Sequence, residues 1–533
     1  MKKYLILFIL LAGAILRLYK LNEIPVSPYW EEVALGYDAY SISKTGRDHH
    51  GNSYPVIAFP SYGDYKPSGY FYAIVPFVKL LGLNMWSVRL PSALAGIASV
   101  GLLYLIAKEL FDEQIGLLAA LLFAIQPWAI QFSRGGWEVN FSLFLLLVGT
   151  WQLVLARKKP LHLIAGVIFF CLAMYTYHAA RLFAPLVGVI FGILLIISWM
   201  SSLRRQGSRQ QVLSLVCSFL LLIAFLFPLL SNLSNKQVSS RFTDTSIFSD
   251  VTPVLQSNAA IAAQGNTRIA KLLYHRFWYY GAIVLKQWAS HFSYNFLFVR
   301  GDGNLRHSIV RIGLLYPIEA IFIIVGILFL LRTANRALLP ILVWIIFAAV
   351  PAALVTPAPH ALRDLYAAPA YALLSAIGII ALLRVKKTKV LVTLLVICGY
   401  FFFTARYLST YYLVYPTESA ADWQYGYKEL YVKLGALKRS GEQVYVSRQI
   451  GRPAMYYLFY TAYDPATLQQ KEPTLPKDQL ELLQVDDYHF VDGVPSGKGL
   501  FATTGDTLVL GGKIVGNVLS LDKSIIWTIW RRE

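Results

Sequence analysis

Long apolar runs dominate this sequence and limit what the chain can fold into. A helix that crosses a bilayer needs about 20 predominantly apolar residues. A soluble fold would break such runs with polar residues at helical or strand spacing. Charged residues make up only 14% of the 533 residues, whereas a typical soluble domain has about 25%. We therefore expect an all-α polytopic membrane bundle of about 11 transmembrane helices, over 4–21, 87–108, 113–131, 138–156, 161–178, 181–200, 211–230, 311–331, 338–356, 363–384 and 388–411.

One further apolar stretch, 69–83, is only about fifteen residues long, which favours an interfacial helix over a crossing. If it does not cross, nearly all the short basic loops fall on one side of the membrane. They include Lys2 with Lys3, 157–159, Arg332 with Arg336, and the run from Arg384 to Lys389. Basic loops concentrate on the cytoplasmic side of membrane proteins. This arrangement predicts a cytoplasmic N-terminus and an extracytoplasmic C-terminus.

The same topology divides the chain into two predicted domains. Residues 1–411 form the transmembrane domain, with long outer loops at 22–86 and 231–310. Residues 412–533 mix charges with short apolar runs, such as 443–446 and 507–510, after a helical stretch at 422–440. A segment of this length and pattern is typical of a small soluble domain. We expect a small α/β extracytoplasmic domain there.

The formal net charge of +19 does not indicate a nucleic-acid partner, because much of the excess lies in the short basic loops. The three cysteines, Cys171, Cys217 and Cys398, all lie in apolar runs without metal-ligand spacing. They are interpreted as small apolar residues. The expected partners are the lipid bilayer and the ligands of the extracytoplasmic face, which the residues below indicate.

Two adjacent carboxylates, Glu31 and Glu32, open a stretch with helical spacing over 29–44, for which Gly46 is a plausible stop. Acidic residues are favoured in the first turn of any helix, which is a purely structural explanation. Neighbouring helix residues point about 100° apart. The functional hypothesis is that one carboxylate faces a reacting centre as a general base, while the other orients a neighbour or contacts the substrate.

Basic and histidine side chains gather in five outer segments: 64–68, 133–138, 175–181, 300–307 and 359–364. Each alone is compatible with an ordinary interfacial anchor, because a long cationic side chain can snorkel. Together they indicate one anionic ligand such as a lipid phosphate. The candidate donor- and substrate-binding residues are Lys66, Arg134, Glu138, His178, Arg181, Arg300, His307, His360 and Arg363.

The order of three motifs resembles a known family. They are Glu31-Glu32-Val33-Ala34-Leu35-Gly36-Tyr37-Asp38-Ala39, then Lys66-Pro67, then Arg89-Leu90-Pro91-Ser92-Ala93-Leu94. Over roughly residues 1–200 the chain is similar to the GT-C membrane glycosyltransferases related to protein O-mannosyltransferases and to the lipid A aminoarabinose transferase. The resemblance implies inverting transfer of a hexose or pentose from a polyprenyl-phosphate carrier to a hydroxyl of a protein, lipid or glycan.

By this resemblance Glu31 is the general base, at a place where the family more often has aspartate, and Glu32 is its rival. Lys66 contacts the donor phosphate. Some relatives use a divalent metal near the acidic pair; the sequence shows no clear second ligand set, so a metal is left open and no other cofactor is expected. We expect a bacterial plasma-membrane protein.

Two other functions stay open. A lipid or glycan transporter or flippase would show ionisable residues or broken helices near the middle of the bilayer. A glycan polymerase or ligase that also uses lipid carriers would place its key residues in the loop 231–310 rather than in the first outer loop.

Overall fold

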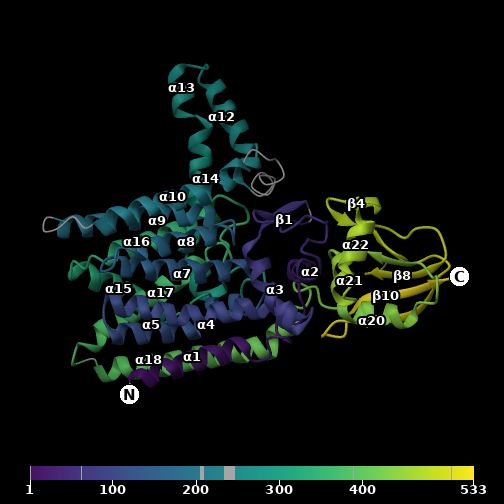
Figure 1. Cartoon of the computed structure of the whole chain (residues 1–533), viewed down its shortest axis with the longest axis horizontal. Helices are drawn as coiled ribbons and strands as arrows, with labels where there is room; N and C mark the ends of the chain where they lie inside the picture. The colour runs from purple at the N-terminus through teal and green to yellow at the C-terminus, as the bar shows by residue number, and fades with distance from the viewer. Residues whose placement is uncertain (1, 62, 204–208, 233–245, 388, 506) are drawn as a thin grey trace.

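The computed structural model describes residues 2–533 except 62, 204–208, 233–245, 388 and 506. Most helices run side by side along one direction, and a mixed sheet closes one end of the bundle (Figure 1). The part of the predicted loop 231–310 that covers 233–245 lies outside the described residues.

Helices occupy each range predicted to cross the membrane. They are α1 (Lys2–Leu18), α4 (Met85–Leu110), α5 (Glu113–Ile125), α7 (Glu138–Ala156), α8 (His162–Met174), α9 (Ala180–Leu203), α10 (Arg209–Ser231), α15 (Glu319–Arg332), α16 (Leu338–Ala353), α17 (Ala368–Leu383) and α18 (Lys389–Ser409). Within the described ranges, six helices are long and apolar enough to cross, or seven if α5 and α6 (Pro127–Ser133), bent by 60°, form one crossing. The count of eleven crossings stays a prediction.

The predicted start of one span at residue 311 is wrong. Residues 311–318 form a loop, and α15 begins only at Glu319. Gly313 packs so closely against Phe298 that an added Cβ would lie 2.3 Å from its carbonyl carbon. Pro317, just before the helix, has no backbone N–H to donate to a preceding turn. The apolar run continues through this loop because its residues pack inside the protein rather than against lipid.

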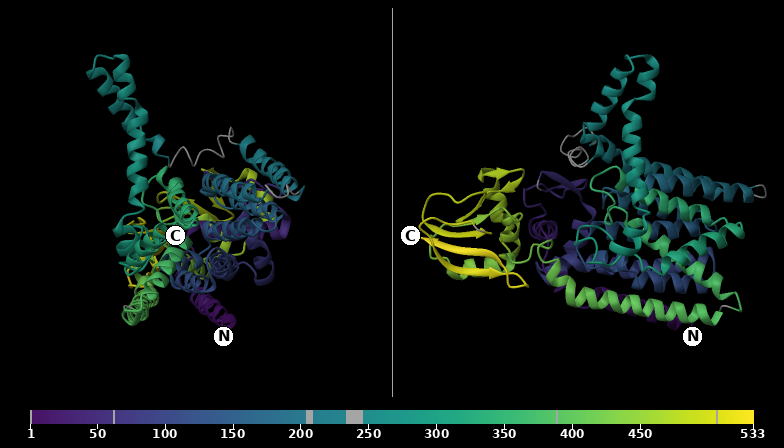
Figure 2. Two further views of the ribbon diagram at one scale, coloured as in Figure 1. Left: turned by 90° about the vertical axis from the view of Figure 1, so that its left-hand side faces the viewer. Right: turned by 180° about the vertical axis from the view of Figure 1, so that it is seen from behind.

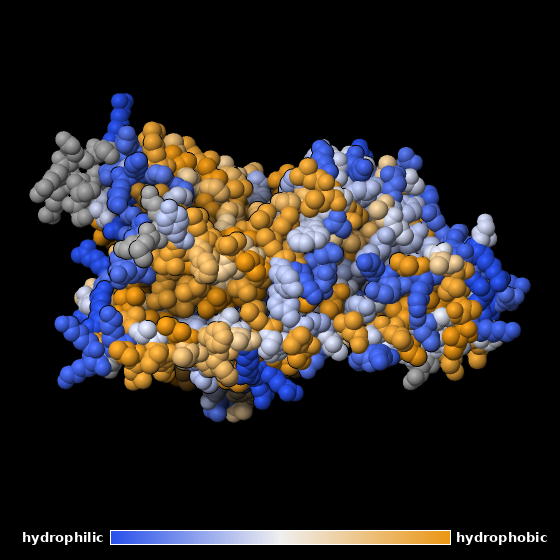
Figure 3. All heavy atoms as spheres, turned by 90° about the horizontal axis from the view of Figure 1, so that it is seen from below, coloured by the Kyte–Doolittle hydropathy of each residue, from blue (hydrophilic) through white to orange (hydrophobic). Residues whose placement is uncertain are grey.

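On the face shown in Figure 3, apolar side chains cover the middle of the bundle, and hydrophilic side chains gather at the end away from the sheet. The outer helices α10 and α18 leave large apolar side chains uncovered, including Phe219, Phe227, Leu391 and Phe401. A helix whose backbone bonds are satisfied internally can present such a face to lipid. The chain is an integral membrane protein.

The segment between α1 and α4, predicted to be the first outer segment, contains α2 (Trp30–Thr45), the hairpin of β1 (Ala58–Ser61) and β2 (Asp64–Pro67), and α3 (Gly69–Leu81). The helix predicted at 29–44 is α2. Gly46 ends it with φ of +72°, a conformation that glycine adopts without strain, and donates its N–H to Ile42 O. The short helix predicted at 69–83 is α3.

Residues 246–290 build an arm that projects away from the side of the bundle (Figures 1 and 2). It contains a 3-10 turn at Ile247–Ser249, then α12 (Thr252–Ala263), α13 (Arg268–Leu273) and α14 (Arg276–Ser290). A π-helical turn, Asn295–Arg300, returns the chain to the bundle. Since α14 has no buried residue, this arm contributes little to the core.

The C-terminal sheet has six strands in the order β6-β7-β3-β8-β10-β9. They are β3 (Val444–Ser447), β6 (Gln484–Val485), β7 (Tyr488–Val491), β8 (Gly499–Thr504), β9 (Lys513–Leu519) and β10 (Ile525–Arg532), accompanied by α20 (Tyr427–Leu437), α21 (Pro453–Tyr460) and α22 (Pro465–Lys471). Strand β3 runs parallel to β7 and β8, whereas β10 is antiparallel to both neighbours. This agrees with the α/β expectation, although the apolar run 507–510 lies in the loop between β8 and β9. The boundary at 411 and 412 stays a prediction.

The C-terminal sheet and its helices α20, α21 and α22 are called the tail domain below. A hydrophobic cluster joins α2 and α3 to this tail domain; it includes Val33, Tyr37, Phe71, Tyr456 and Phe459. Gly36 is at the tightest point, because an added Cβ would lie 2.7 Å from both Phe459 Cε2 and Val88 Cγ2. Helix α2 is thus held between the membrane bundle and the tail domain. This packing fixes the orientation of the residues at its N-terminus.

Candidate functional site

The two adjacent carboxylates at the start of α2 face different surroundings. The Glu31 side chain is 24% exposed and that of Glu32 is fully buried. Glu31 Oε1 lies 2.6 Å from Lys66 Nζ, and Glu31 Oε2 accepts a hydrogen bond of 2.8 Å from the Tyr29 hydroxyl. Glu31 therefore presents a fixed carboxylate to an accessible space.

Both carboxylate oxygens of Glu32 accept hydrogen bonds. Arg89 donates to it twice, from Nε to Oε1 at 2.9 Å and from Nη2 to Oε2 at 3.1 Å, and the Gly136 N–H donates to Oε1 at 2.7 Å. The Arg89 guanidinium also donates to the carbonyls of Leu21, Pro25 and Ser27. A buried pair of this kind is bidentate and directional. It fixes the loop between α1 and α2.

Lys66 lies on β2, opposite Phe59 of β1, and its side chain is only 3% exposed. The strand is held from the side by the turn between α8 and α9. The His178 ring Nε2 contacts the Tyr65 carbonyl at 2.9 Å, and the Gly69 N–H donates to Tyr175 O at 2.8 Å. His178 thus acts through the strand that carries Lys66. Arg181 lies at the start of α9 and interacts electrostatically with Asp64 of the same strand.

The Tyr29 phenol is the meeting point of several charges. Its burial, and then the carboxylates of Glu31, Glu138 and Glu32, raise its pKa well above the usual value, against an opposing effect of Arg306. The Arg306 guanidinium lies 5.1 Å from the centre of the Tyr29 ring. Tyr29 therefore stays protonated and donates its hydrogen bond to Glu31. Glu138, at the start of α7, belongs to this cluster.

Arg134 lies at the end of α1 with its donors bound to protein groups, and the phosphate-binding role predicted for it stays a prediction. Its side chain is fully buried. It donates to Tyr411 Oη at 2.9 Å, to Leu16 O at 2.9 Å and to Tyr19 O at 2.7 Å. Those carbonyls end α1 and would otherwise lack partners. All of its guanidinium nitrogens are therefore in use.

His307 and His360 meet at the carboxylate of Asp302. Asp302 Oδ2 lies 3.2 Å from His307 Nδ1 and 3.6 Å from His360 Nδ1, and the two imidazole rings are 4.8 Å apart. Although burial favours the neutral acid, the hydrogen bond and charge of His307, then that of His360, lower the pKa of Asp302 to about 2. Burial, then His307 and Arg363, lower the pKa of His360 well below its usual value.

These three side chains form a group that could hold a metal ion, and no other such group occurs in the described part of the chain. Ligands that bind a tetrahedral ion at 2.0–2.2 Å lie about 3.3–3.6 Å from one another. The two distances to Asp302 Oδ2 are close to that range. His360 Nδ1 is also buried without a hydrogen-bond partner. The residues therefore fit a divalent metal such as zinc.

One aromatic layer separates this histidine group from the Glu31 cluster. The Trp137 ring stacks on Tyr29 at 5.1 Å between ring centres and meets the His307 ring edge-on at 5.6 Å. Arg306 reaches the same layer through its contact with the Tyr29 ring. The loop 301–308 and the start of α2 therefore contribute to one region.

Arg300 and Arg363 are placed differently from each other. Arg363 lies close enough to His360 to act on its charge. Arg300 ends the π-helical turn with an exposed side chain. The structure thus brings together Glu31, Lys66, Glu138, His178 and Arg181 around β2 and Tyr29, and His307, His360 and Arg363 around Asp302.

Sequence reasoning missed four residues of this region: Tyr29, Arg89, Asp302 and Arg306. Asp302 and Arg306 lie in the same short motif as Arg300 and His307, and Tyr29 directly precedes the helix that carries the acidic pair. Their positions within these motifs were the only signal in the sequence that could have identified them. Which member of such a motif faces inward depends on a tight turn, since Gly301 has φ of +69° and packs against Ser308.

Residues 65–230 match the sequence model of the family described as dolichyl-phosphate-mannose-protein mannosyltransferase. The matched segment includes Lys66 and Arg89 but not Glu31. The chain is also similar to two proteins of Bacillus subtilis (strain 168). It is 30% identical over 159 residues, 29% of this chain, to the putative mannosyltransferase YkcB, and 32% identical over 131 residues, 21% of this chain, to the putative mannosyltransferase YycA. The matches span 21% and 19% of those relatives' lengths.

The fold is similar to that of ArnT from Cupriavidus metallidurans. The apo crystal structure matches with a TM-score of 0.53 and 12% identity, over 98% of this chain and 97% of that one. The structure of that protein bound to undecaprenyl phosphate matches with a TM-score of 0.53 and 11% identity, over the same shares of the two chains.

These matches confirm the predicted resemblance, in sequence over the central segment and in fold over nearly the whole chain. This integral membrane protein therefore has a fold similar to that of ArnT, and its residues 65–230 match the mannosyltransferase family model.

Proposed function

We propose that this protein is an inverting glycosyltransferase that moves a sugar from a polyprenyl-phosphate carrier to a hydroxyl acceptor. The observation that carries the proposal is the accessible Glu31 carboxylate, held by Lys66 at 2.6 Å and Tyr29 at 2.8 Å. An accessible base in contact with a cation meets the two needs of the reaction, which are a proton acceptor and a positive charge for the phosphate.

In the proposed reaction, the acceptor hydroxyl attacks the anomeric carbon on the face opposite the phosphate. A new carbon–oxygen bond forms to the acceptor as the bond to the phosphate breaks, which inverts the configuration. Glu31 takes the hydroxyl proton, a form of help typically worth about 10²–10⁴ in rate. The bonding pair leaves with the phosphate, whose negative charge Lys66 stabilises.

The surrounding residues position these two groups. Tyr29 holds one oxygen of the Glu31 carboxylate and leaves the other to face Lys66. His178 steadies the strand that carries Lys66. Arg306, over the Tyr29 ring, adds a second cation near the acid. Because these groups come from α2, β2 and the loop 301–308, the site forms only when the outer loops pack together.

A metal, if bound, would be held by Asp302, His307 and His360, one aromatic layer from Glu31. It would supply a fixed positive charge able to attract an anionic oxygen. The positions of Glu31 and Lys66 do not depend on it, because their contacts are made with protein groups alone.

The outer-face location rests on the basic loops at the far end of the bundle. We propose that the N-terminus is cytoplasmic, that the site and the tail domain are extracytoplasmic, and that the membrane is the bacterial plasma membrane. The sugar is a hexose or pentose, and the acceptor is a protein, lipid or glycan hydroxyl.

The decisive experiment incubates the purified full chain with labelled polyprenyl-phosphate sugars and a panel of hydroxyl acceptors. Glu31→Gln keeps the size of the side chain but removes the base, so turnover should fall by at least about 100-fold. Glu418→Gln, at an exposed acid on the same chain, is the matched control and should keep full activity. Full activity of Glu31→Gln would overturn the assignment, and loss confined to Asp302→Asn would favour the lipid-carrier polymerase or ligase instead.

A further inference from the structure

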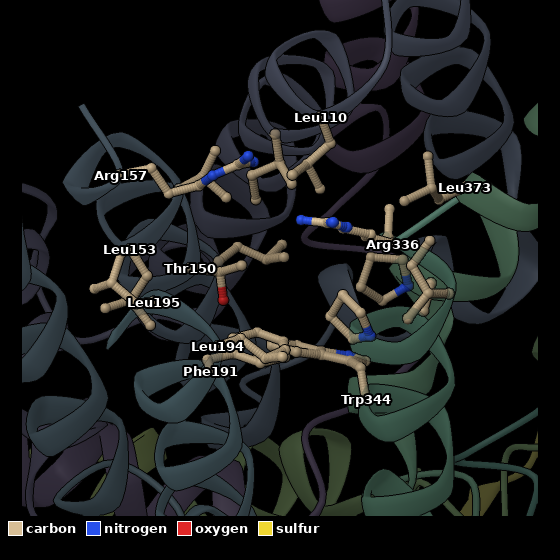
Figure 4. Close-up of a pocket in the computed structure, with 18 of the residues that line it drawn as sticks. Leu110, Thr150, Leu153, Arg157, Phe191, Leu194, Leu195, Arg336, Trp344 and Leu373 are labelled. Carbon is tan, nitrogen blue, oxygen red and sulfur yellow. The ribbon is translucent and has the colours of Figure 1, made fainter. Parts of the chain in front are cut away.

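A large cavity lies at the opposite end of the bundle from Glu31. Its volume is about 440 Å³, and α4, α7, α9, α16 and α17 form its walls (Figure 4). It reaches the end of α7 at Arg157 and the turn before α16 at Arg336. Both positions belong to the basic loops that gather at this end of the molecule. The cavity therefore opens at the basic end of the spans.

The walls are apolar and the mouth is cationic. Side chains such as Leu147, Phe191 and Trp344 build the walls. The guanidinium groups of Arg157 and Arg336 point toward each other across the space (Figure 4). No acidic residue is found among the described side chains that line the cavity.

The two arginines have no acidic partner in the described part of the chain. Among the residues that the structure describes, neither side chain forms an ion pair with a carboxylate, and both are exposed. Neighbouring basic residues at this end behave differently, since Lys158 pairs with Glu109 and Lys108 with Glu113. Two cations left facing each other over an apolar slot repel unless an anion lies between them.

We propose that this cavity binds an anionic phospholipid, with one acyl chain in the apolar slot and the phosphate between Arg157 and Arg336. Guanidinium groups bind phosphate through directional paired hydrogen bonds. Basic pockets between membrane helices, at the side of the membrane where basic loops gather, commonly bind acidic lipid headgroups. The cavity volume falls within the usual range of ligand pockets, roughly 300–1,000 Å³.

The apolar lining decides between a lipid and free phosphate. A free phosphate would leave the slot between Leu147, Phe191 and Trp344 without a partner. A lipid tail fills this slot, and the apolar surfaces of the tail and of the cavity walls are then both removed from water. The inference concerns a site remote from Glu31 and does not depend on the proposed transfer reaction.

The lipid would join helices that are far apart in sequence. The end of α7 and the start of α16 each supply one arginine, and α9 supplies part of the apolar wall. A ligand that binds only the folded arrangement stabilises it in proportion to its occupancy. Bound lipid should therefore raise the thermal stability of the whole chain.

The test uses native mass spectrometry and thermal unfolding of the purified full chain with four probes: phosphatidylglycerol, phosphatidylcholine, diacylglycerol and inorganic phosphate. We expect phosphatidylglycerol to bind most tightly and to raise the unfolding temperature. Arg157→Gln combined with Arg336→Gln should weaken phosphatidylglycerol binding about 10- to 30-fold, because each cation near such a headgroup is worth about 1 kcal/mol. Diacylglycerol binding should stay unchanged in that variant.

Lys386→Gln combined with Lys387→Gln is the matched control, since it removes the same charge from exposed residues at the same end. It should keep the preference for phosphatidylglycerol. If the arginine variant does not fold, Ala370→Phe, which fills the cavity from α17, should weaken phosphatidylglycerol and diacylglycerol alike. Equal binding of phosphatidylglycerol and phosphatidylcholine by the wild-type chain, equal losses in both double variants, or displacement of the lipid by millimolar phosphate would overturn the proposal.

Discussion

Lys66 Nζ lies 2.6 Å from Glu31 Oε1, although the two residues belong to different elements of the first outer segment. The cation is almost fully buried, whereas the acid keeps part of its surface open. This asymmetry gives each a separate role. The contact holds Lys66 in place, so in the proposed reaction the donor phosphate approaches Lys66 beside the Glu31 carboxylate.

Replacing Lys66 by alanine should impair use of the lipid donor more than use of the acceptor. Loss of a hydrogen bond to a charged group costs about 1.5–3 kcal/mol, so kcat/KM for the donor should fall roughly 10- to 100-fold. Steady-state kinetics with each substrate varied in turn would measure this. Lys79→Ala, at an exposed lysine near the end of α3, is the control. Equal losses for donor and acceptor would contradict the phosphate role.

Glu32→Gln should destabilise the chain, while Glu31→Gln should leave its stability nearly unchanged. Glu32 and Arg89 are both fully buried, and removing one partner of a buried pair costs about 3–5 kcal/mol. The unfolding temperature of each variant in the same detergent measures the difference. The double variant Glu32→Gln/Arg89→Gln should lose less than the sum of the single losses, because no uncompensated charge remains. Additive losses would show that the two residues act independently.

The chain should bind one divalent metal through Asp302, His307 and His360. After treatment with a chelator and reloading with zinc, elemental analysis should find about one equivalent per chain. Asp302→Asn and His360→Gln should each lose it. His275→Asn keeps a capping side chain on α14, outside the group, and should retain it. Retention of stoichiometric zinc by the double variant His307→Gln/His360→Gln would rule these ligands out.

His49 should make stability depend on pH. Its Nδ1 lies 2.6 Å from Asp38, and Asp48, Glu472 and His50 also face it. Although burial opposes the charged ring, Asp38, then Asp48 and Glu472, raise the pKa of His49 above 6.5. A raised pKa means that the stabilising contribution is complete below pH 6.5 and is lost as pH rises through the folded-state value.

The measurement compares unfolding temperatures of wild type and His49→Gln from about pH 5.5 to 8.5, the range in which histidine titrates. The wild-type advantage should be largest at the acidic end and shrink as pH rises. Burial, then the charge of His49, lowers the pKa of His50, so that ring contributes in the opposite direction. An advantage that grows with pH would contradict the assignment.

Local patterns were enough to predict α2 and its end. The acidic first turn, the helical spacing and Gly46 all act within a few residues, and the structure shows the same helix. The apolar runs likewise placed a helix in each predicted range. Their lengths did not determine the number of crossings, because a run such as 311–331 begins as a buried loop before α15.

The candidate site was only partly predictable, because its contacts join distant segments. Nothing near Arg134 in the sequence shows that its guanidinium caps α1, whose Leu16 carbonyl is 118 residues away. The division of labour between Glu31 and Glu32 also depends on Arg89, 57 residues beyond Glu32. The residue types predicted a positively charged side chain at each of these positions. They did not show whether its N–H donors already had partners within the protein.

The packing of Gly36 against Phe459 has a practical consequence for how this protein is studied. Cutting the chain before the sheet domain would uncover Val33 and Tyr37, and an exposed apolar surface of that kind promotes aggregation. An inactive truncated product would then report misfolding and not the absence of a needed acceptor contact. Point substitutions on the distal strands β9 and β10 are the cleaner way to ask what the tail contributes.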